Sequence, residues 1–332
     1  MIHKILRLFL PILMLFPFQA ACSGKPQAPV SAAGQSAAAG PSAAGQEISG
    51  PPPAGSLTYG ELEPRQRAER MMKALAAGYP QAIEKTEFRN GDWAVFMKGR
   101  WFYCANGRLL PEELLDRQDS FAPQSFYRYF SDLPEWEVPE GENAERLKNA
   151  LGNRRANPPR RAPDFFDTLW DAHSRNESYD NLIQIRFLGR AVLVHRGIAG
   201  RLAKIDERVQ EAAKIDPAIQ PWIDNIGSLG AWNWRNVAAT ASRSFHSYAT
   251  AVDILPKSMQ GLQTYWQWTA DNNAEWYTVP YTRRFHPPEA IVKAFEAYGF
   301  CWGGKWPLFD TMHFEYRPEI MLMYNLPVED IE

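Results

Sequence analysis

Two short stretches of the chain decide its fold and its chemistry. The first, SFHSYATAVDI, covers residues 244–254, and the second, GFCWGGKW, covers residues 299–306 and leads into DTMHFE at 310–315. Residues 251–255 are typical of a short strand, in which Asp253 points away from Val252 and Ile254 because side chains alternate between faces. His313 lies between two apolar neighbours in the same way.

His246, Asp253 and His313 have the chemistry of a metal site. An isolated buried carboxylate is very unfavourable, so Asp253 requires a partner. Two imidazoles and one carboxylate that converge suit Zn²⁺, whose catalytic sites combine three protein ligands with one water. Asp310 or Glu315 could then take the proton from that water. Taken singly, however, each histidine can also be a hydrogen-bonded structural residue, and Asp253 a cap.

The combined pattern is more specific than its parts. The spacing His-x6-Asp, then Gly-Phe-x-Trp-Gly-Gly-x-Trp, then Asp-x-x-His resembles the zinc D-alanyl-D-alanine carboxypeptidase and L-alanyl-D-glutamate peptidase family, which includes vancomycin-resistance peptidases and phage endolysins. The similar region runs from about residue 198 to 318. The resemblance implies an α+β fold in which a small antiparallel sheet carries the zinc site and helices surround it, preceded by an accessory region.

The resemblance also implies the roles of the site residues. His246, Asp253 and His313 would be the zinc ligands, and Asp310 the catalytic base and acid. One position departs from the family pattern: Ala249 stands where the family usually has glycine, which at such positions serves backbone geometry or close packing.

An arginine upstream of the first ligand holds the substrate carboxylate or the oxyanion in this family. Arg235 is the best match for this catalytic role, and Arg243 is the reserve candidate. Further substrate contacts are predicted for Arg243, Tyr248, Trp302 and Trp306. The alternatives are that the arginines are surface charges and that the tryptophans belong to the core.

The amino terminus has the features of an export signal. A basic start precedes an apolar run at residues 8–18, which is too short to span a bilayer and has the length of a signal-peptide core. The following Ala20-Ala21-Cys22 resembles a bacterial lipobox, although Gln19 departs from its usual aliphatic residue. We therefore predict an exported protein lipidated at Cys22, held on the periplasmic side of the outer membrane. The alternative is an ordinary cleaved signal that ends in cysteine.

The chain divides into four predicted parts. A signal peptide (1–22) precedes a linker (23–56) of mainly Ala, Gly, Pro, Ser and Gln, whose composition cannot support a core. An accessory region (57–185) and the zinc peptidase domain (186–332) follow. In an oxidising compartment Cys104 and Cys301 would either form a disulfide or remain two separately buried thiols.

Several elements are readable from local patterns. We predict helices at 64–77, 198–212 and 289–298, a hairpin at 92–104 around Lys98-Gly99, and a long surface connection at 134–163.

The predicted function is hydrolysis of peptidoglycan stem peptides, as a D,D-carboxypeptidase or an L-Ala-D-Glu endopeptidase. The partners are wall peptides, and a membrane through the lipid anchor. The formal net charge of −2 gives no field that would attract nucleic acid. The alternative is a non-catalytic peptidoglycan-binding lipoprotein that keeps the fold.

Overall fold

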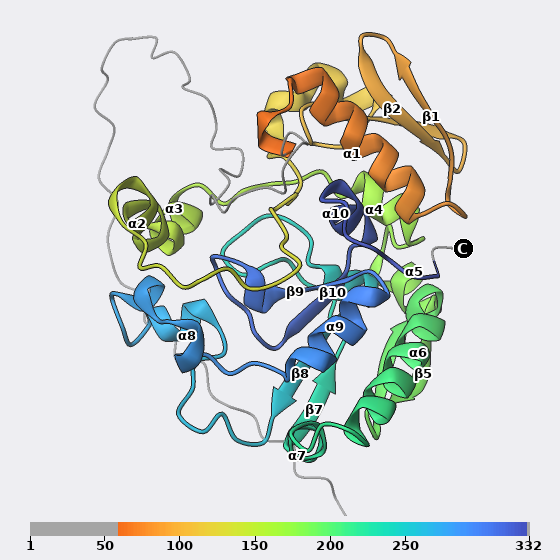
Figure 1. The fold of residues 1–332 in the computed structure, drawn as a ribbon. Coiled ribbons are helices and arrows are strands. Elements are labelled where there is room, and N and C mark those ends of the chain that lie inside the picture. Colours follow the sequence, from red (N-terminus) through yellow and green to blue (C-terminus); the bar gives the residue numbers. More distant parts are fainter. Residues whose placement is uncertain (1–58, 331–332) are drawn as a thin grey trace, which may run out of the picture. The chain divides into compact units, whose positions relative to one another are not determined.

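The computed structural model describes residues 59–330 (Figure 1). Within this range the strands form two four-stranded antiparallel sheets and one hairpin. We call the sheet of order β1-β2-β3-β4 the N-terminal sheet and the sheet of order β7-β8-β10-β9 the site sheet. The predicted α+β class with small antiparallel sheets is confirmed. The predicted signal peptide, Cys22 and the linker lie outside the described residues.

The strands are β1 (Ile83–Arg89), β2 (Asp92–Met97), β3 (Arg100–Tyr103), β4 (Leu110–Pro111), β5 (Leu182–Phe187), β6 (Arg190–His195), β7 (Ile226–Gly230), β8 (Ala251–Pro256), β9 (Phe300–Trp302) and β10 (His313–Tyr316). The α-helices are α1 (Pro64–Gly78), α2 (Gly141–Lys148), α3 (Ala150–Ala156), α4 (Asp164–Leu169), α5 (Arg175–Asp180), α6 (Arg196–Ala213), α7 (Ile219–Asp224), α8 (Trp266–Ala270), α9 (Glu289–Ala297) and α10 (Pro318–Met323). The 3₁₀ helices are η1 (Tyr59–Glu61), η2 (Glu112–Ser120), η3 (Phe245–Tyr248), η4 (Trp276–Thr278), η5 (Tyr281–Arg283) and η6 (Gly303–Lys305).

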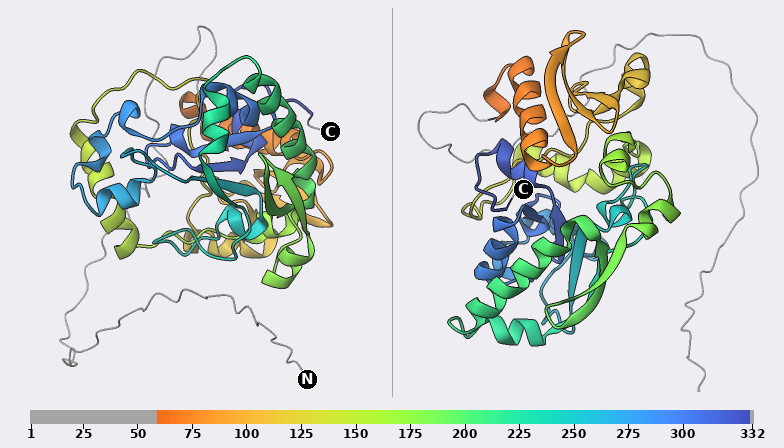
Figure 2. Two further views of the ribbon diagram at one scale, coloured as in Figure 1. Left: turned by 90° about the horizontal axis from the view of Figure 1, so that it is seen from below. Right: turned by 90° about the vertical axis from the view of Figure 1, so that its right-hand side faces the viewer.

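The N-terminal sheet is built from consecutive hairpins. Its first two turns, Asn90-Gly91 and Lys98-Gly99, have positive φ at both residues, which matches the twist of two-residue hairpins. Helix α1 lies against β1 and β2 (Figures 1 and 2) and buries Met71, Met72 and Leu75. The predicted helix and the hairpin of β2 and β3 are confirmed. Strand β1 was not predicted, although the Asn-Gly turn is a strong hairpin signal.

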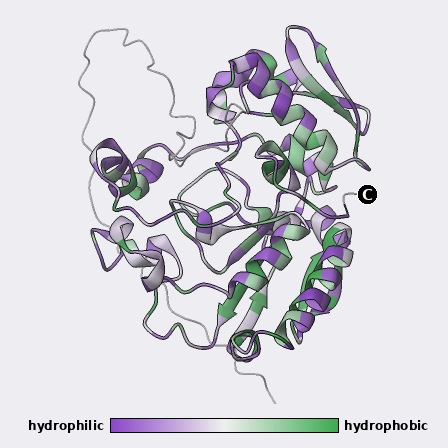
Figure 3. Cartoon of the chain, viewed as in Figure 1, coloured by the Kyte–Doolittle hydropathy of each residue, from purple (hydrophilic) through white to green (hydrophobic). Residues whose placement is uncertain are grey.

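The predicted amphipathic helix at 198–212 is confirmed as α6. Its buried residues Ile198, Leu202, Ile205 and Val209 recur at spacings of four and three, which places them on one face. Hydrophobic and hydrophilic residues accordingly alternate along α6 in Figure 3. The helix directly follows β6, and the imidazole of His195 accepts the Gly197 backbone N–H at 3.0 Å as its cap.

The site sheet joins segments that are far apart in the chain. Its central strands, β8 and β10, pair with each other, while β7 and β9 lie at the edges. Helix α9, which confirms the prediction at 289–298, packs on this sheet, and its Phe295 stacks on Phe314 at a centroid distance of 3.9 Å. The sheet is therefore anchored to the apolar core on the side away from Asp253 and His313.

The prediction of a long surface connection at 134–163 is wrong in part. Helices α2 and α3 lie in this segment. Leu147 of α2 is buried in a small cluster with Trp266, Trp276 and Phe309. Helix α2 therefore has apolar packing partners, which the Pro- and Arg-rich sequence around it does not indicate.

The main hydrophobic cluster contains residues from both sides of the predicted division near 185. Leu75, Val95 and Phe102 belong to it together with Leu202 and Phe314. The accessory region and the peptidase domain thus share a core, and the division itself stays a prediction. No helix among residues 59–330 combines the length and the apolar character needed to cross a bilayer.

Cys104 and Cys301 are both buried free thiols, which corrects the disulfide prediction. The Cys104 sulfur lies 3.9 Å from Met71 Sδ in the main cluster. Cys301 belongs to another cluster, where its thiol donates to the Arg317 carbonyl at 3.7 Å. The two side chains have separate packing partners, so the second of the two alternatives holds.

Candidate metal centre

The register of the site sheet brings Asp253 and His313 together. They are direct cross-strand partners on β8 and β10. Cross-strand partners in an antiparallel pair project on the same face of the sheet. The apolar neighbours Val252 and Phe314 are fully buried on the opposite face. The alternation expected from the sequence is therefore what places a carboxylate beside an imidazole.

His246 reaches the same point from outside the sheet. It lies in η3, which Ser244 begins by accepting the His246 backbone N–H and which Ala249 ends. The His246 Nδ1 atom lies 2.8 Å from the Ala231 carbonyl oxygen. Because a carbonyl only accepts, Nδ1 carries the proton, and the lone pair of Nε2 faces the cluster.

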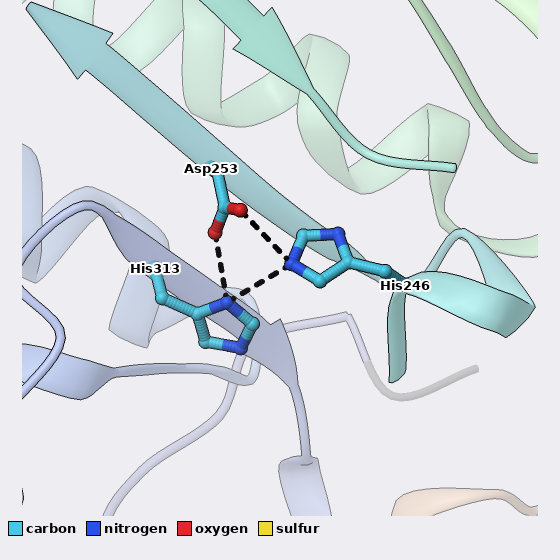
Figure 4. A group of neighbouring side chains, drawn as sticks. All are labelled: His246, Asp253 and His313. Atoms are coloured by element: carbon cyan, nitrogen blue, oxygen red, sulfur yellow. Dashed lines mark hydrogen bonds and ion pairs between the residues drawn. The ribbon is translucent and has the colours of Figure 1, made fainter. Parts of the chain in front are cut away.

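Three ligand atoms converge on one point (Figure 4). His246 Nε2 and His313 Nδ1 lie 3.2 Å apart, and His313 Nδ1 lies 2.9 Å from Asp253 Oδ1. His246 Nε2 lies 3.2 Å from Asp253 Oδ2. Tetrahedral bonds of about 2.1 Å would separate ligand atoms by about 3.4 Å. The three side chains therefore fit a zinc ion after movements of a few tenths of an ångström.

The electrostatics of the cluster favour a positive charge at this point. Although burial alone would raise it, the neighbouring imidazoles of His246 and His313 hold the pKa of Asp253 well below its usual range. Burial alone would lower the pKa of His313, but the carboxylates of Asp253 and Glu315 raise it to about 10. The donor set and the charge both fit a divalent metal ion.

Asp310 lies beside the cluster with an unused oxygen. Its Oδ1 is buried and has no hydrogen-bond partner among residues 59–330. Burial, with a further contribution from the Asp253 charge, raises the pKa of Asp310 to about 7. The Asp310 carbonyl accepts the His313 backbone N–H at 3.2 Å, so the turn before β10 fixes both residues. A buried carboxylate oxygen without a hydrogen-bond partner is energetically unfavourable, so this oxygen marks a place where a water molecule or a substrate group can bind.

The two candidate arginines have different surroundings. Burial raises the pKa of Asp310, and the Arg235 charge opposes this rise in small part, so the guanidinium interacts with this carboxyl. The Arg235 side chain is exposed and donates to the Asn236 carbonyl at 3.3 Å. Arg243 instead donates to Asp167 Oδ1 and to the Ala172 carbonyl, each at 3.1 Å. Arg235 is therefore the more accessible of the two guanidiniums, whereas Arg243 forms a structural ion pair.

Tyr248 and Trp302 do not lie where a substrate could reach them. Tyr248 is 2% exposed and donates its hydroxyl to Asp167 Oδ1 at 2.9 Å. Trp302 is 3% exposed, and its indole N–H donates to the Thr311 carbonyl at 2.9 Å. Both side chains are packed inside the protein. For Trp302 this agrees with the alternative that the tryptophans belong to the core. Trp306 is half-buried, and its ring lies 5.4 Å from that of His313.

The structure gives a reason for the family's usual glycine at position 249. Ala249 has φ 54° and ψ 32°, in the left-handed region that glycine adopts without strain. This conformation turns the chain from η3 into β8, so that His246 and Asp253 face each other. The position serves backbone geometry, and alanine there carries a conformational penalty.

Tyr127 is a residue of the site that the sequence does not predict. Its hydroxyl donates to Glu315 Oε1 at 2.9 Å across 188 positions of the chain. No local pattern marks a tyrosine in an irregular segment as part of a distant site, so only the tertiary structure reveals it. Glu315, considered in the sequence as a possible base, lies on the far side of the His313 ring from the metal-facing nitrogen.

Comparison with protein families supports this interpretation of the cluster. Residues 238–316 match the model of a family described as D-alanyl-D-alanine carboxypeptidase. This range contains His246, Asp253, Asp310 and His313, and the match supports a metallopeptidase with hydrolase activity. Residues 71–126 match the model of a domain of unknown function. No curated protein and no solved structure gives a significant match.

Proposed function

We propose that this protein is a zinc-dependent metallopeptidase that hydrolyses peptidoglycan stem peptides. The observation that carries the proposal is the convergence of His246, Asp253 and His313 beside the buried, unpartnered oxygen of Asp310. The match of residues 238–316 to the carboxypeptidase family adds independent support.

Zinc would be held by His246 Nε2, His313 Nδ1 and one oxygen of Asp253. When bound, it would supply a Lewis acid that polarises the scissile carbonyl and lowers the pKa of a water molecule. The protein fixes the His246 nitrogen in advance, since the Ala231 carbonyl holds the other nitrogen of this ring. Preorganised ligands of this kind lower the reorganisation needed during the reaction.

Asp310 is the proposed general base and acid. Its unpartnered Oδ1 accepts the proton of the attacking water, and it then returns that proton to the amine of the leaving group. Glu315 is not available for this step, because its oxygens contact His313, Tyr127 and Arg317. Arg235 provides the positive charge near Asp310 that would hold a substrate carboxylate or the oxyanion.

A cavity reaches the segment that holds His246. It has a volume of about 280 Å³ and lies between β6 and β7, with Leu193, Leu229, Gly230, Ala231 and Trp232 in its lining. The Ala231 carbonyl is the acceptor of His246, so the cavity reaches a residue that holds one of the ligands. We propose that it receives part of a stem peptide with a D-residue at the cut, by D,D-carboxypeptidase or L-Ala-D-Glu endopeptidase action.

The proposal includes export and a lipid anchor at Cys22 on the periplasmic side of the outer membrane. It is supported by the basic start, the apolar run and the small residues before the cysteine. Metabolic labelling with a fatty-acid analogue should mark the wild type and leave Cys22→Ala unlabelled. Equal labelling of both would end this part of the proposal.

The function is tested by metal analysis and digestion of purified muropeptides. We expect about one zinc per chain and release of a D-amino acid or a stem-peptide fragment, identified by mass spectrometry. The mass of the product also names the bond that is cut. Stoichiometric zinc with intact muropeptides would favour the non-catalytic wall-binding alternative, and absence of zinc would refute the metal site.

A further inference from the structure

A buried chain of polar groups extends from His313 away from the metal ligands. While His313 Nδ1 faces Asp253, its Nε2 lies 3.2 Å from Glu315 Oε2. The two residues alternate with Phe314 on β10, so they project on the same face of the strand. Both are less than 10% exposed, and the contact is therefore shielded from water.

Glu315 is itself held by two further groups. Its other oxygen accepts the Tyr127 hydroxyl at 2.9 Å and Arg317 Nη1 at 3.3 Å. Arg317 also donates through Nε to Glu319, and through Nη2 to the Ser125 carbonyl at 3.2 Å. The Arg317 charge thus lies between two carboxylates, so a buried cation compensates the charge on Glu315.

The series of contacts that begins at His313 ends next to α1. Glu319 Oε2 accepts the Tyr79 hydroxyl at 2.7 Å, and Tyr79 follows the last residue of α1. Tyr79, Ser125 and Tyr127 all lie in the predicted accessory region, outside the range that matches the carboxypeptidase family. Residues of the predicted accessory region therefore belong to the hydrogen-bond network behind the metal ligand His313.

We propose that Glu315 is a positioning residue for His313 and that Tyr127 holds Glu315 in place. A carboxylate that accepts the Nε2 proton fixes the tautomer in which the Nδ1 lone pair faces the metal. It also sets the angle of the ring and raises the basicity of the ligand. The accessory region is then part of the metal centre, and its removal would damage metal binding directly.

The inference rests on the proposed zinc site but not on the proposed substrate. It predicts that zinc affinity falls when the contacts behind His313 are removed, even though every ligand is kept. Outer partners of a metal ligand typically contribute about 10- to 100-fold in metal affinity. Glu315→Gln should raise the zinc dissociation constant by roughly this factor, because the amide is a weaker acceptor and carries no charge.

Tyr127→Phe gives the sharper test, because Tyr127 does not contact His313 through a hydrogen bond. We expect a smaller rise of the dissociation constant, about 3- to 10-fold, since one of two groups that orient Glu315 is lost. Tyr129→Phe is the matched control. Its hydroxyl donates to the Glu296 carboxylate at 2.6 Å and accepts the Trp302 backbone N–H at 2.8 Å, so the variant also loses a buried phenol–carboxylate bond, but to Glu296 rather than to Glu315.

The experiment measures zinc dissociation constants by chelator competition on the folded full-length protein and its three variants. Absorption spectra of the cobalt-substituted forms and thermal unfolding midpoints accompany them. We expect altered cobalt spectra and weaker zinc binding for Glu315→Gln and Tyr127→Phe, and wild-type values for Tyr129→Phe, whatever its unfolding midpoint. Wild-type zinc binding in the first two variants, or an equal loss in Tyr129→Phe, would overturn the inference. Wild-type protein that binds zinc but leaves muropeptides intact would refute only the proposed peptidase function.

Discussion

The N-terminal sheet and the site sheet have the same number of antiparallel strands and opposite construction. The N-terminal sheet pairs its strands in chain order, and tight turns join β1 to β2 and β2 to β3. The site sheet pairs β8 with β10, which are separated by α8, α9 and β9 in the chain. One sheet is the product of local turns, whereas the other forms only when distant segments meet.

The difference extends to the side chains on the sheets. On the N-terminal sheet, cross-strand partners such as Phe96 and Trp101 pack as aromatic pairs, with Arg89 over the Trp101 ring at 4.2 Å. On the site sheet the central pair is Asp253 and His313. The N-terminal sheet, which is built from local turns, contributes packing. The site sheet, which joins distant segments, bears the cluster that we assign to catalysis. The four predictions below test this contrast.

The largest expected effects separate the metal ligands from the catalytic base. Asp310→Asn should keep zinc and a normal fold but lose about 10²- to 10⁴-fold in turnover, the usual contribution of general acid–base catalysis. His313→Ala should weaken zinc binding itself, because a ligand is removed. Zinc content and muropeptide turnover of both variants provide the measurement.

Two results would contradict this division of roles. Loss of zinc from Asp310→Asn as complete as from His313→Ala would make Asp310 a ligand. Full activity of Asp310→Asn with full zinc content would remove it from proton transfer. Glu315 could then be considered as the base only if its contacts with Tyr127 and Arg317 were released.

The sequence predicted the local sheet and the long-range site by different means. The hairpin of β2 and β3 followed from Lys98-Gly99 and its flanking residues, because a turn is determined by nearby positions. His246, Asp253 and His313 were grouped by resemblance to a family, since alternation along each strand does not reveal which strands pair. The register between β8 and β10 shows that Asp253 and His313 are direct neighbours.

What the sequence could not predict was the environment of individual side chains. Tyr248 and Trp302 belong to the matching motifs, yet both are buried and use their polar atoms internally. Tyr127 lies outside every motif and contacts Glu315. Whether an aromatic residue faces substrate or core depends on packing from distant segments, which leaves no periodic signal in the chain.

The second prediction concerns the core that the two sheets share. Leu75→Ala in α1 and Leu202→Ala in α6 both remove fully buried side chains from the same cluster. Each should lower the free energy of unfolding by about 2–5 kcal/mol. Because the core is common, both variants should unfold in one transition, whether fluorescence or circular dichroism is followed. A separate early transition in Leu75→Ala would show that the N-terminal sheet unfolds independently.

The third prediction concerns His195, a buried histidine outside the metal cluster. Burial lowers its pKa to about 4, whereas the unfolded chain would have the ordinary value of about 6.5. Between these values the unfolded state binds the proton and the folded state does not. The contribution of His195 to stability is therefore full above pH 6.5 and falls as the pH is lowered towards 4, by at most about 3 kcal/mol.

The test compares urea unfolding of the wild type and His195→Asn between pH 4 and pH 7. Asparagine is a good helix cap and does not titrate, so it can replace the contact to Gly197. The difference in stability between the two proteins should change across this range. His286→Asn, at an exposed histidine, controls for the loss of one imidazole. A difference that stays constant with pH would refute the buried neutral state of His195.

The smallest effect concerns the backbone that brings the distant segments of the site sheet together. Ala249 has a left-handed conformation between η3 and β8, and its Cβ makes this conformation unfavourable by about 1–2 kcal/mol. Ala249→Gly should relieve this penalty, partly offset by the larger entropy of glycine in the unfolded chain, and stabilise the protein by about 0.5–1 kcal/mol. The matched control is Ala251→Gly, two residues later in the extended strand β8. Both alanines are fully buried, so each variant loses a buried methyl group, but at Ala251 glycine relieves no left-handed strain and should destabilise. Urea unfolding of the two variants should therefore give shifts of opposite sign. Shifts of the same sign would mean that the left-handed turn at Ala249 is not strained, and that the family's glycine at this position serves close packing instead.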